Sequence, residues 1–182
     1  MKEDKMIRKA VERDLAGIAG IYEAIIDQEE KNAASIGWKR GVYPTEDTAR
    51  QALNRGDLYV MEADGQTIVG SAIINQVQVA EYANCPWQYP AAEKDVLVLH
   101  TLVVDPAQSK NGCGRSFVNF YEELAREAGI RYLRMDTNVR NEVARAFYRK
   151  MGYKEPGIVS CVFNGIEGVQ LVCLEKKLEE VI

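Results

Sequence analysis

One segment decides most of what can be inferred about the fold of this chain. Residues 95–104 form a nearly continuous apolar run, and the segment D-P-A-Q-S-K-N-G-C-G-R-S, residues 105–116, follows it directly. Beyond that segment, apolar residues recur at helical spacing up to Gly129, at Phe117, Phe120, Tyr121, Leu124 and Ala128. This order predicts a strand buried on both faces, a tight turn, and an amphipathic helix that begins at Gly112 or Gly114.

The turn between that strand and helix has the chemistry of an anion site. Gly112 and Gly114 carry no Cβ atom that would block an anion. The first N–H groups of a helix have no intrahelical partner, and they lie at the positive end of the helix dipole. We therefore expect the backbone of this turn to bind phosphate, with Lys110 and Arg115 as additional cations.

The spacing of Gly112 and Gly114 fits two common types of phosphate-binding glycine loop poorly. A Walker loop, G-x-x-x-x-G-K-[ST], needs glycine where Ser109 stands and lysine where Arg115 stands. A dinucleotide-binding G-x-G-x-x-G that begins at Gly112 meets Phe117 at its third glycine. A turn that joins a strand to a helix and binds nothing is the remaining alternative.

Periodicity and turn signals along the rest of the chain predict a mixed α/β fold. Asp64-Gly65 separates two β-rich runs and indicates a hairpin. We predict strands at 6–9, 58–63, 67–79, 95–104, 131–136, 158–163 and 169–177, and helices at 15–26, 45–54, 112–129 and 141–152. Because no repeat or flexible linker interrupts the chain, a single domain over residues 1–182 is expected.

Composition excludes several classes of function. A net charge of -4 lacks the basic excess that nucleic-acid binding requires. Four widely spaced cysteines and a single histidine argue against a metal site. The charged N-terminus does not resemble a signal peptide, and no apolar run approaches the roughly 18 residues of a membrane span. We expect a cytoplasmic protein without nucleic-acid, membrane or metal partners.

Two segments resemble the motifs of the GNAT superfamily of N-acetyltransferases. V-V-D-P at 103–106, followed by K-N-G-C-G at 110–114, resembles motif A, [Q/R]-x-x-G-x-[G/A] after a V-x-P strand end. Ser109 stands where the family usually has Gln or Arg. Residues 141–153, N-E-V-A-R-A-F-Y-R-K-M-G-Y, resemble the second motif, N-x-x-A-x-x-[F/L]-Y-x-x-x-G-[F/Y]. The element order predicted above also fits this superfamily along essentially the whole chain.

The resemblance implies a mixed, mostly antiparallel splayed sheet flanked by helices, with acetyl-CoA bound where two strands part. The backbone of Leu102, Val103 and Val104 would then pair with the pantetheine arm. Asn141 would hydrogen-bond the cofactor, and Tyr148 would stand near its sulfur. The pyrophosphate would lie against the turn formed by Ser109, Lys110, Asn111, Gly112, Cys113, Gly114, Arg115 and Ser116.

The implied reaction is transfer of an acetyl group to a primary amine by direct attack in a ternary complex. Tyr148 is the expected acid, and a backbone N–H of Val103 or Val104 the expected oxyanion donor. His100 is the expected base, because its ordinary pKa suits proton transfer near neutral pH and its position resembles that of a strand histidine in the arylalkylamine N-acetyltransferases. Other residues considered as the base are Glu81, Glu93 and Asp95.

Two further residue roles remain open in the sequence. Cys113 sits at a helix start, where a thiol pKa can fall, but no second histidine is available to activate it. Several aromatic residues lie in the segments that form the acceptor side of this fold, which predicts an aromatic pocket, with ordinary packing as the alternative. The residues expected to bind the acceptor are Trp38, Tyr43 and Tyr82. The same segments also contain Trp87 and Tyr89.

The acceptor itself is expected to be a small-molecule amine, with a protein amine second. A non-catalytic acyl-CoA-binding or sensing module with the same fold is the alternative function. Homodimerisation is a further expectation from the family, although the sequence locates no interface.

Overall fold

The protein forms one open seven-stranded sheet in the computed structural model, which describes residues 5–31 and 35–179. The strand order is β1-β2-β3-β4-β5-β7-β6, and every neighbouring pair is antiparallel except β4 and β5. The strands are β1 Lys5–Lys9, β2 Leu58–Ala63, β3 Thr67–Asn75, β4 Val96–Val104, β5 Tyr132–Asn138, β6 Lys154–Phe163 and β7 Ile166–Lys177. The expected order of elements and the mixed, mostly antiparallel sheet are confirmed.

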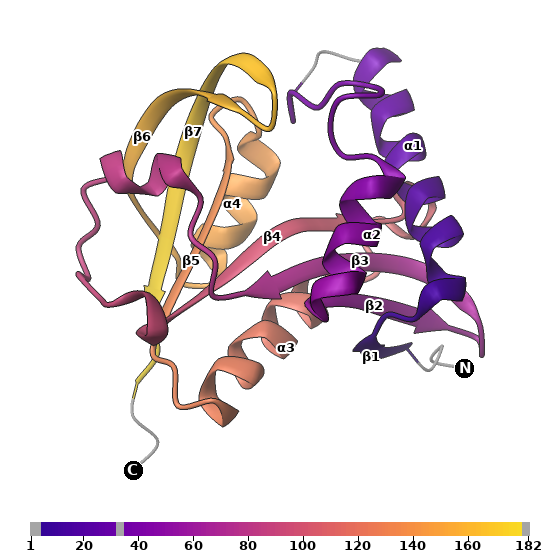
Figure 1. The fold of residues 1–182 in the computed structure, drawn as a ribbon, viewed down its shortest axis with the longest axis horizontal. Coiled ribbons are helices and arrows are strands. Elements are labelled where there is room, and N and C mark those ends of the chain that lie inside the picture. Colours follow the sequence, from indigo (N-terminus) through magenta and orange to yellow (C-terminus); the bar gives the residue numbers. More distant parts are fainter. Residues whose placement is uncertain (1–4, 32–34, 180–182) are drawn as a thin grey trace.

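Helices cover both faces of the sheet (Figure 1). They are α1 Leu15–Lys31, α2 Glu46–Arg55, α3 Cys113–Glu127 and α4 Glu142–Lys150. Helices α1 and α2 pack with β2 and β3 in one apolar cluster, whereas α3 and α4 pack against the opposite face in a larger one. A third cluster lies between β6, β7 and the segment 76–95.

Strands β4 and β5 separate soon after they begin. Their parallel pairing runs from Val96 opposite Tyr132 to Val98 opposite Arg134 and then stops. On its other edge β4 stays paired with β3, through a register shift near Thr101, whose backbone φ of 48° is the left-handed conformation. This bulge bends β4 away from β5. The predicted splay of the sheet is therefore confirmed.

Strand β4 is not buried along its whole length, contrary to the prediction. Residues 96–99 are buried, but His100, Thr101 and Leu102 are only partly covered. They lie where β5 has diverged and a cavity takes its place. An apolar strand pattern does not distinguish contact with core from contact with a binding cavity, which explains the error.

Strand boundaries also differ from the predicted ones. Strand β3 ends at Asn75 and not at Val79, because the Asn75 side chain accepts a hydrogen bond from the backbone N–H of Val77 at 2.9 Å and turns the chain. Strands β6 and β7 begin earlier than predicted and form a hairpin around Asn164-Gly165, both with positive φ. This asparagine-glycine pair is a turn signal that the sequence carries.

The segment 76–95 is held on the sheet by buried polar contacts. The Arg134 guanidinium stacks 4.1 Å from the Trp87 ring centroid and donates a 2.9 Å hydrogen bond to the Tyr89 carbonyl. The buried Glu175 carboxylate accepts the backbone N–H of Gln88 at 2.7 Å. These contacts fix a segment without regular strands over β5 and β7.

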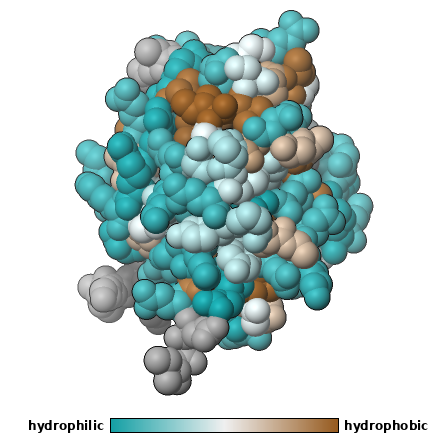
Figure 2. Space-filling view, turned by 90° about the vertical axis from the view of Figure 1, so that its left-hand side faces the viewer, coloured by the Kyte–Doolittle hydropathy of each residue, from teal (hydrophilic) through white to brown (hydrophobic). Residues whose placement is uncertain are grey.

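The surface is mostly hydrophilic, as Figure 2 shows for one side of the molecule, with apolar residues gathered near one end. Strand β6 is an edge strand, and it exposes 52% of Ile158 and 57% of Val162. Within residues 5–31 and 35–179 no helix has the length and apolar character needed to cross a bilayer.

Candidate active site

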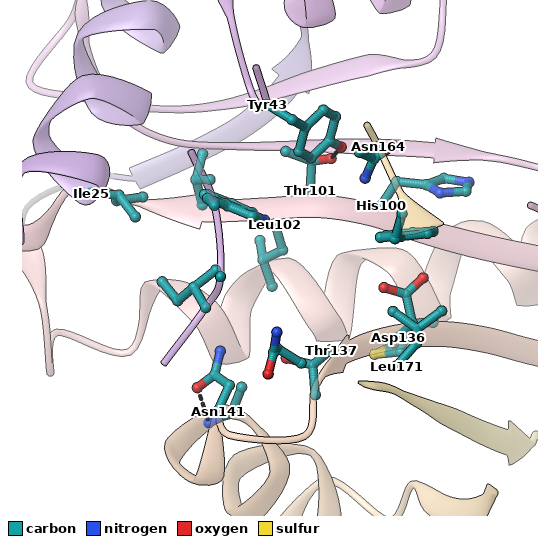
Figure 3. A pocket seen from close by; sticks show the side chains of 18 of the residues that line it. Ile25, Tyr43, His100, Thr101, Leu102, Asp136, Thr137, Asn141, Asn164 and Leu171 are labelled. Atoms are coloured by element: carbon teal, nitrogen blue, oxygen red, sulfur yellow. Dashed lines mark hydrogen bonds between the residues drawn. The ribbon is translucent and has the colours of Figure 1, made fainter. Parts of the chain in front are cut away.

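A cavity of about 480 Å³ occupies the place where β4 and β5 diverge. Its walls come from β4, β5 and β7, the start of α4, the end of α1, and the segments around residues 36–43 and 163–164. Figure 3 shows Asn141 at one end, and Tyr43, His100, Asn164 and Asp136 around the other. The cavity therefore extends from the beginning of α4 to a space between β4 and the β6–β7 hairpin. We call this space, which is lined by Tyr43, His100, Asp136 and Asn164, the chamber.

The turn before α3 continues from one end of this cavity. Ser109 lines the cavity, and the residues 110–116 that follow it do not. Within the described chain, the backbone N–H groups of residues 112–115 have no backbone partner, whereas Ser116 donates to Gly112 at 3.0 Å and Asn111 to Gln108 at 3.4 Å. Of the amides at 111–116 that are expected to bind the pyrophosphate, those of residues 112–115 are unpaired in the described chain.

The two glycines of the turn have different physical requirements. Gly112 caps α3 with φ of 75°, a conformation that side chains other than glycine rarely adopt. A Cβ on Gly114 would lie 3.6 Å from the Phe147 ring, which is ordinary contact, so the fold itself tolerates a methyl group there. Cys113, between them, is buried in the core at 2% exposure and is not part of the cavity.

The direction of the backbone in β4 follows from its pairing with β3. Val104 stands opposite Gly70, and Asp105 donates its N–H to the Val69 carbonyl at 2.9 Å. In an antiparallel ladder this makes the Val104 position non-hydrogen-bonded, so its own N–H and C=O point away from β3. They point toward the gap that β5 has left.

Asn141 and Tyr148 both reach the cavity from α4. The Asn141 side chain caps the helix, accepting the Ala144 N–H at 3.1 Å (Figure 3). The Tyr148 ring packs between Phe147 and Tyr153, and burial raises the pKa of its phenol. No hydrogen bond to the Tyr148 hydroxyl is found in the described part of the chain, so this donor is available to a bound molecule.

His100 lies on the β4 wall but is held in a polar network of its own. Its Nε2 is 2.9 Å from Asn75 Oδ1, and the Asn75 amide nitrogen donates to Asp57 at 2.8 Å. The second bond orients the amide, so His100 carries its proton on Nε2. Burial lowers the pKa of His100 to about 4, so the ring is neutral at physiological pH.

Asp136 is a cavity residue that sequence reasoning missed. It projects from β5 into the chamber beneath His100 (Figure 3), and it accepts a 2.6 Å hydrogen bond from the Tyr82 hydroxyl. Burial raises the pKa of Asp136 to about 6, although the Tyr82 bond opposes this rise. The available signal was a lone carboxylate on the strand expected to border the gap.

The aromatic residues expected around the acceptor divide into two groups. Trp38 and Tyr43 line the cavity with ring centroids 6.1 Å apart, and the Tyr43 hydroxyl bonds the Thr101 hydroxyl. Tyr82 is 2% exposed and lies behind the wall, where it contacts Asp136. The remaining aromatic and acidic residues named from the sequence do not line this cavity in the described structure: Trp87, Tyr89, Glu81, Glu93 and Asp95.

The chain can be assigned to a protein family, because the model of the acetyltransferase (GNAT) family matches residues 11–153. The chain belongs to the GNAT acetyltransferase family. The match includes both motifs, the splayed strands β4 and β5, and the start of α4. The resemblance inferred from the two motifs is thereby confirmed.

Two curated N-acetyltransferases are similar to part of the chain. An uncharacterized N-acetyltransferase of Methanocaldococcus jannaschii is 29% identical over 76 residues, covering 42% of this chain and 34% of that protein. The N-alpha-acetyltransferase RimI of Mycobacterium tuberculosis is 32% identical over 100 residues, covering 55% and 54%. The matched region thus spans about a third to a half of these relatives.

Solved structures share the fold along nearly the whole chain. A ribosomal-protein-alanine N-acetyltransferase of Brucella melitensis superposes with a TM-score of 0.69 at 23% identity, covering 95% of this chain and 99% of that one. An acetyltransferase-like protein of Salmonella typhimurium, solved with its cofactor acetyl-CoA, has a TM-score of 0.69 at 17% identity, covering 98% and 96%. At these identities the likeness establishes the fold.

The residues present fit acetyl-CoA on structural grounds. Four backbone N–H groups at 112–115 are unpaired at a helix start, which suits a pyrophosphate. The outward-turned backbone of Val104 suits an extended amide-containing arm along the β4 edge. In the described chain, no group of three or more metal-ligating side chains is assembled.

Proposed function

We propose that this protein transfers an acetyl group from acetyl-CoA to a small primary amine by direct attack in a ternary complex. The observation that carries the proposal is one continuous cavity that reaches from Ser109 and Asn141 past Tyr148 to Asp136. In this proposal the cavity runs along the unpaired edge of β4 and past the proposed acid and base, and the anion-binding turn follows Ser109 at its end. Membership of the GNAT family supports the same reaction.

Cofactor binding in this proposal rests mainly on backbone groups. The amides at 112–115 hold the pyrophosphate, and Ser109, in place of the usual Gln or Arg, contributes a short polar side chain at the cavity end. Val104 pairs with the pantetheine arm, and its N–H is our choice for the oxyanion donor over that of Val103. The bound cofactor supplies the acetyl group as a thioester.

Asp136 takes the role of base in our proposal, in place of His100. A carboxylate with a pKa of about 6 is ionised at neutral pH and basic enough to accept a proton from an ammonium group, directly or through water. His100, with a pKa of about 4 and its Nε2 proton bound to Asn75, is a weaker base. It serves better as a neutral wall of the chamber.

Tyr148 is the proposed acid. Its hydroxyl has no partner among the described residues, its side chain lines the cavity together with Asn141 and Ala144, and burial keeps the phenol protonated. Tyr148 therefore donates its proton to the departing sulfur and regains one from solvent or from the acceptor side.

A protein amine is the second candidate acceptor, because two relatives carry names that state such activity: N-alpha-acetyltransferase RimI and ribosomal-protein-alanine N-acetyltransferase. The segments that enclose the chamber favour a small-molecule acceptor over a protein amine. Residues 36–43 approach from one side and the β6–β7 hairpin from the other, and both contribute walls around Tyr43 and Asn164.

The test is a two-stage measurement on the wild-type protein. Titration calorimetry measures acetyl-CoA binding, and a thiol-detection assay then measures CoA release over a panel of amines, amino acids and peptides. Binding together with amine-dependent CoA release is expected. Binding without release for any acceptor would favour a non-catalytic acyl-CoA-binding module, and the absence of binding would contradict both functions.

A further inference from the structure

The charged side chains around the chamber are of one sign, negative. Among the described residues that line the cavity, Asp136 is the one carboxylate, and there is no lysine or arginine. His100 adds no positive charge at neutral pH, because burial holds its pKa at about 4. A ligand group that sits beside Asp136 therefore meets negative charge and no cation.

The cation in one adjoining hollow is already paired. That second cavity, of about 500 Å³, shares Tyr43, His100 and Asn164 with the first and is also lined by Arg55. The Arg55 guanidinium donates to both oxygens of Asp57, at 2.9 Å and 3.3 Å. Its charge is compensated before any ligand arrives, so it offers a carboxylate little net attraction.

The rest of the chamber is apolar. Tyr43, Val79 and Phe163 line it and pack together on the third apolar cluster with the buried Leu171. Trp38 packs edge-on against Tyr43 and extends this wall. Burial of a hydrocarbon or aromatic group against such side chains is favourable, whereas an unpaired carboxylate would be desolvated without compensation.

We propose that the acceptor is a primary amine with an apolar, preferably aromatic, body and no carboxylate on the carbon that bears the nitrogen. Its ammonium group lies at Asp136, and its body lies against Tyr43, Val79 and Phe163. An α-carboxylate would sit beside the Asp136 carboxylate, where like charges repel and no cation among the described residues that line the cavity compensates. This inference rests on the proposed function, because it assigns a substrate class to the same site.

Matched acceptors test the proposal with the wild-type protein. Phenethylamine, phenylalanine and phenylalanine methyl ester share the same ring and amine, but only phenylalanine carries an α-carboxylate. We expect kcat/KM for phenethylamine and for the ester to exceed that for phenylalanine by about 100-fold or more, the size of a like-charge contact in a partly buried site.

The possible outcomes distinguish a failure of the proposed substrate class from a failure of the proposed acetyl-transfer function. Equal or better use of phenylalanine would overturn the substrate class while supporting the acetyl-transfer function. A phenylalanine-first peptide amide that outperforms phenethylamine would also overturn the class, in favour of a protein amine. Binding of acetyl-CoA with transfer to other amines of the panel but to none of these acceptors would overturn the substrate class alone, and binding with no transfer to any amine of the panel would overturn both.

A charge introduced into the wall gives a second test. Val79 is partly buried in the chamber wall, so Val79→Lys adds a cation there and Val79→Met adds similar length without charge. We expect the ratio of kcat/KM for phenylalanine to that for phenethylamine to rise at least about tenfold in the lysine variant and to stay unchanged in the methionine variant. An unchanged ratio in the lysine variant would contradict the electrostatic basis of the proposal.

Discussion

At the scale of single residues, the hydrogen bond from Tyr82 to Asp136 is the contact on which the proposed base depends. The two residues are 54 positions apart and meet at 2.6 Å. Burial raises the pKa of Asp136, and this bond limits the rise because it stabilises the ionised form. Tyr82, expected from the sequence to touch the acceptor, instead acts in our proposal through the carboxylate.

Replacement of Tyr82 by phenylalanine tests this contact. Without the hydroxyl the Asp136 pKa rises further, and a base works only when deprotonated, so the acidic limb of kcat/KM moves to higher pH by up to about one unit. A pH–rate profile measures the shift. Tyr89→Phe is the control, because Tyr89 does not line the cavity, and a profile for Tyr82→Phe that matches this control would refute the role.

Replacement of Tyr148 by phenylalanine tests the acid. Loss of the phenolic proton should lower kcat by roughly 100-fold, the usual contribution of a positioned acid, and leave acetyl-CoA binding nearly intact. Steady-state kinetics and calorimetry measure the two quantities. Tyr59→Phe, which removes a hydroxyl outside the cavity, should retain wild-type turnover. Undiminished turnover in Tyr148→Phe would exclude Tyr148 as the acid.

At the scale of elements, the parting of β4 from β5 creates the site. The bulge near Thr101 turns β4 while β3 keeps it in the sheet, and the freed edge at Val104 faces the cavity. Helix α3 then begins where this edge ends and presents the unpaired amides of residues 112–115. In our proposal a strand edge and a helix start therefore bind the cofactor through backbone groups, which side-chain substitutions would leave largely intact.

The two glycines of the turn should respond differently to alanine. Gly112→Ala forces an alanine into a left-handed conformation and should lower the free energy of unfolding by about 1–2 kcal/mol, measured by urea denaturation. It should also weaken acetyl-CoA binding, because the turn shifts. Gly114→Ala is the matched control, with stability near wild type. Equal stability of the two variants would contradict the assigned geometry of the turn.

Local patterns explain which elements could be predicted. Helical spacing after Gly114 and the two family motifs are enough to predict α3, α4, Asn141 and Tyr148, because these signals lie within short stretches of sequence. The end of β3 depends on the Asn75 side chain, and the earlier starts of β6 and β7 depend on hairpin pairing. Helix α1 runs to Lys31, past its last apolar residue, and Glu29 there accepts the N–H of Gly37 at 2.8 Å.

At the scale of the whole molecule, the site depends on contacts between distant segments. The Asp136 carboxylate is buried and bonded to Tyr82 because segment 76–95 is held across β5 through Arg134, Trp87 and Glu175. No spacing in the sequence shows this arrangement, whereas His100 stands out as the single histidine. The cytoplasmic location, the single domain over the full chain and the homodimer expected from the sequence stay predictions.

The pH dependence of acetyl transfer tests the central claim, that this cavity transfers an acetyl group to an amine with Asp136 as its base. The wild type and His100→Gln should both lose kcat/KM as pH falls through about 6, the pKa of Asp136, because protonation removes the base. Asp136→Asn should lower kcat/KM by roughly 100-fold or more and lack this limb, with acetyl-CoA binding retained. A profile that Asp136→Asn leaves unchanged, or that His100→Gln abolishes, would contradict the account.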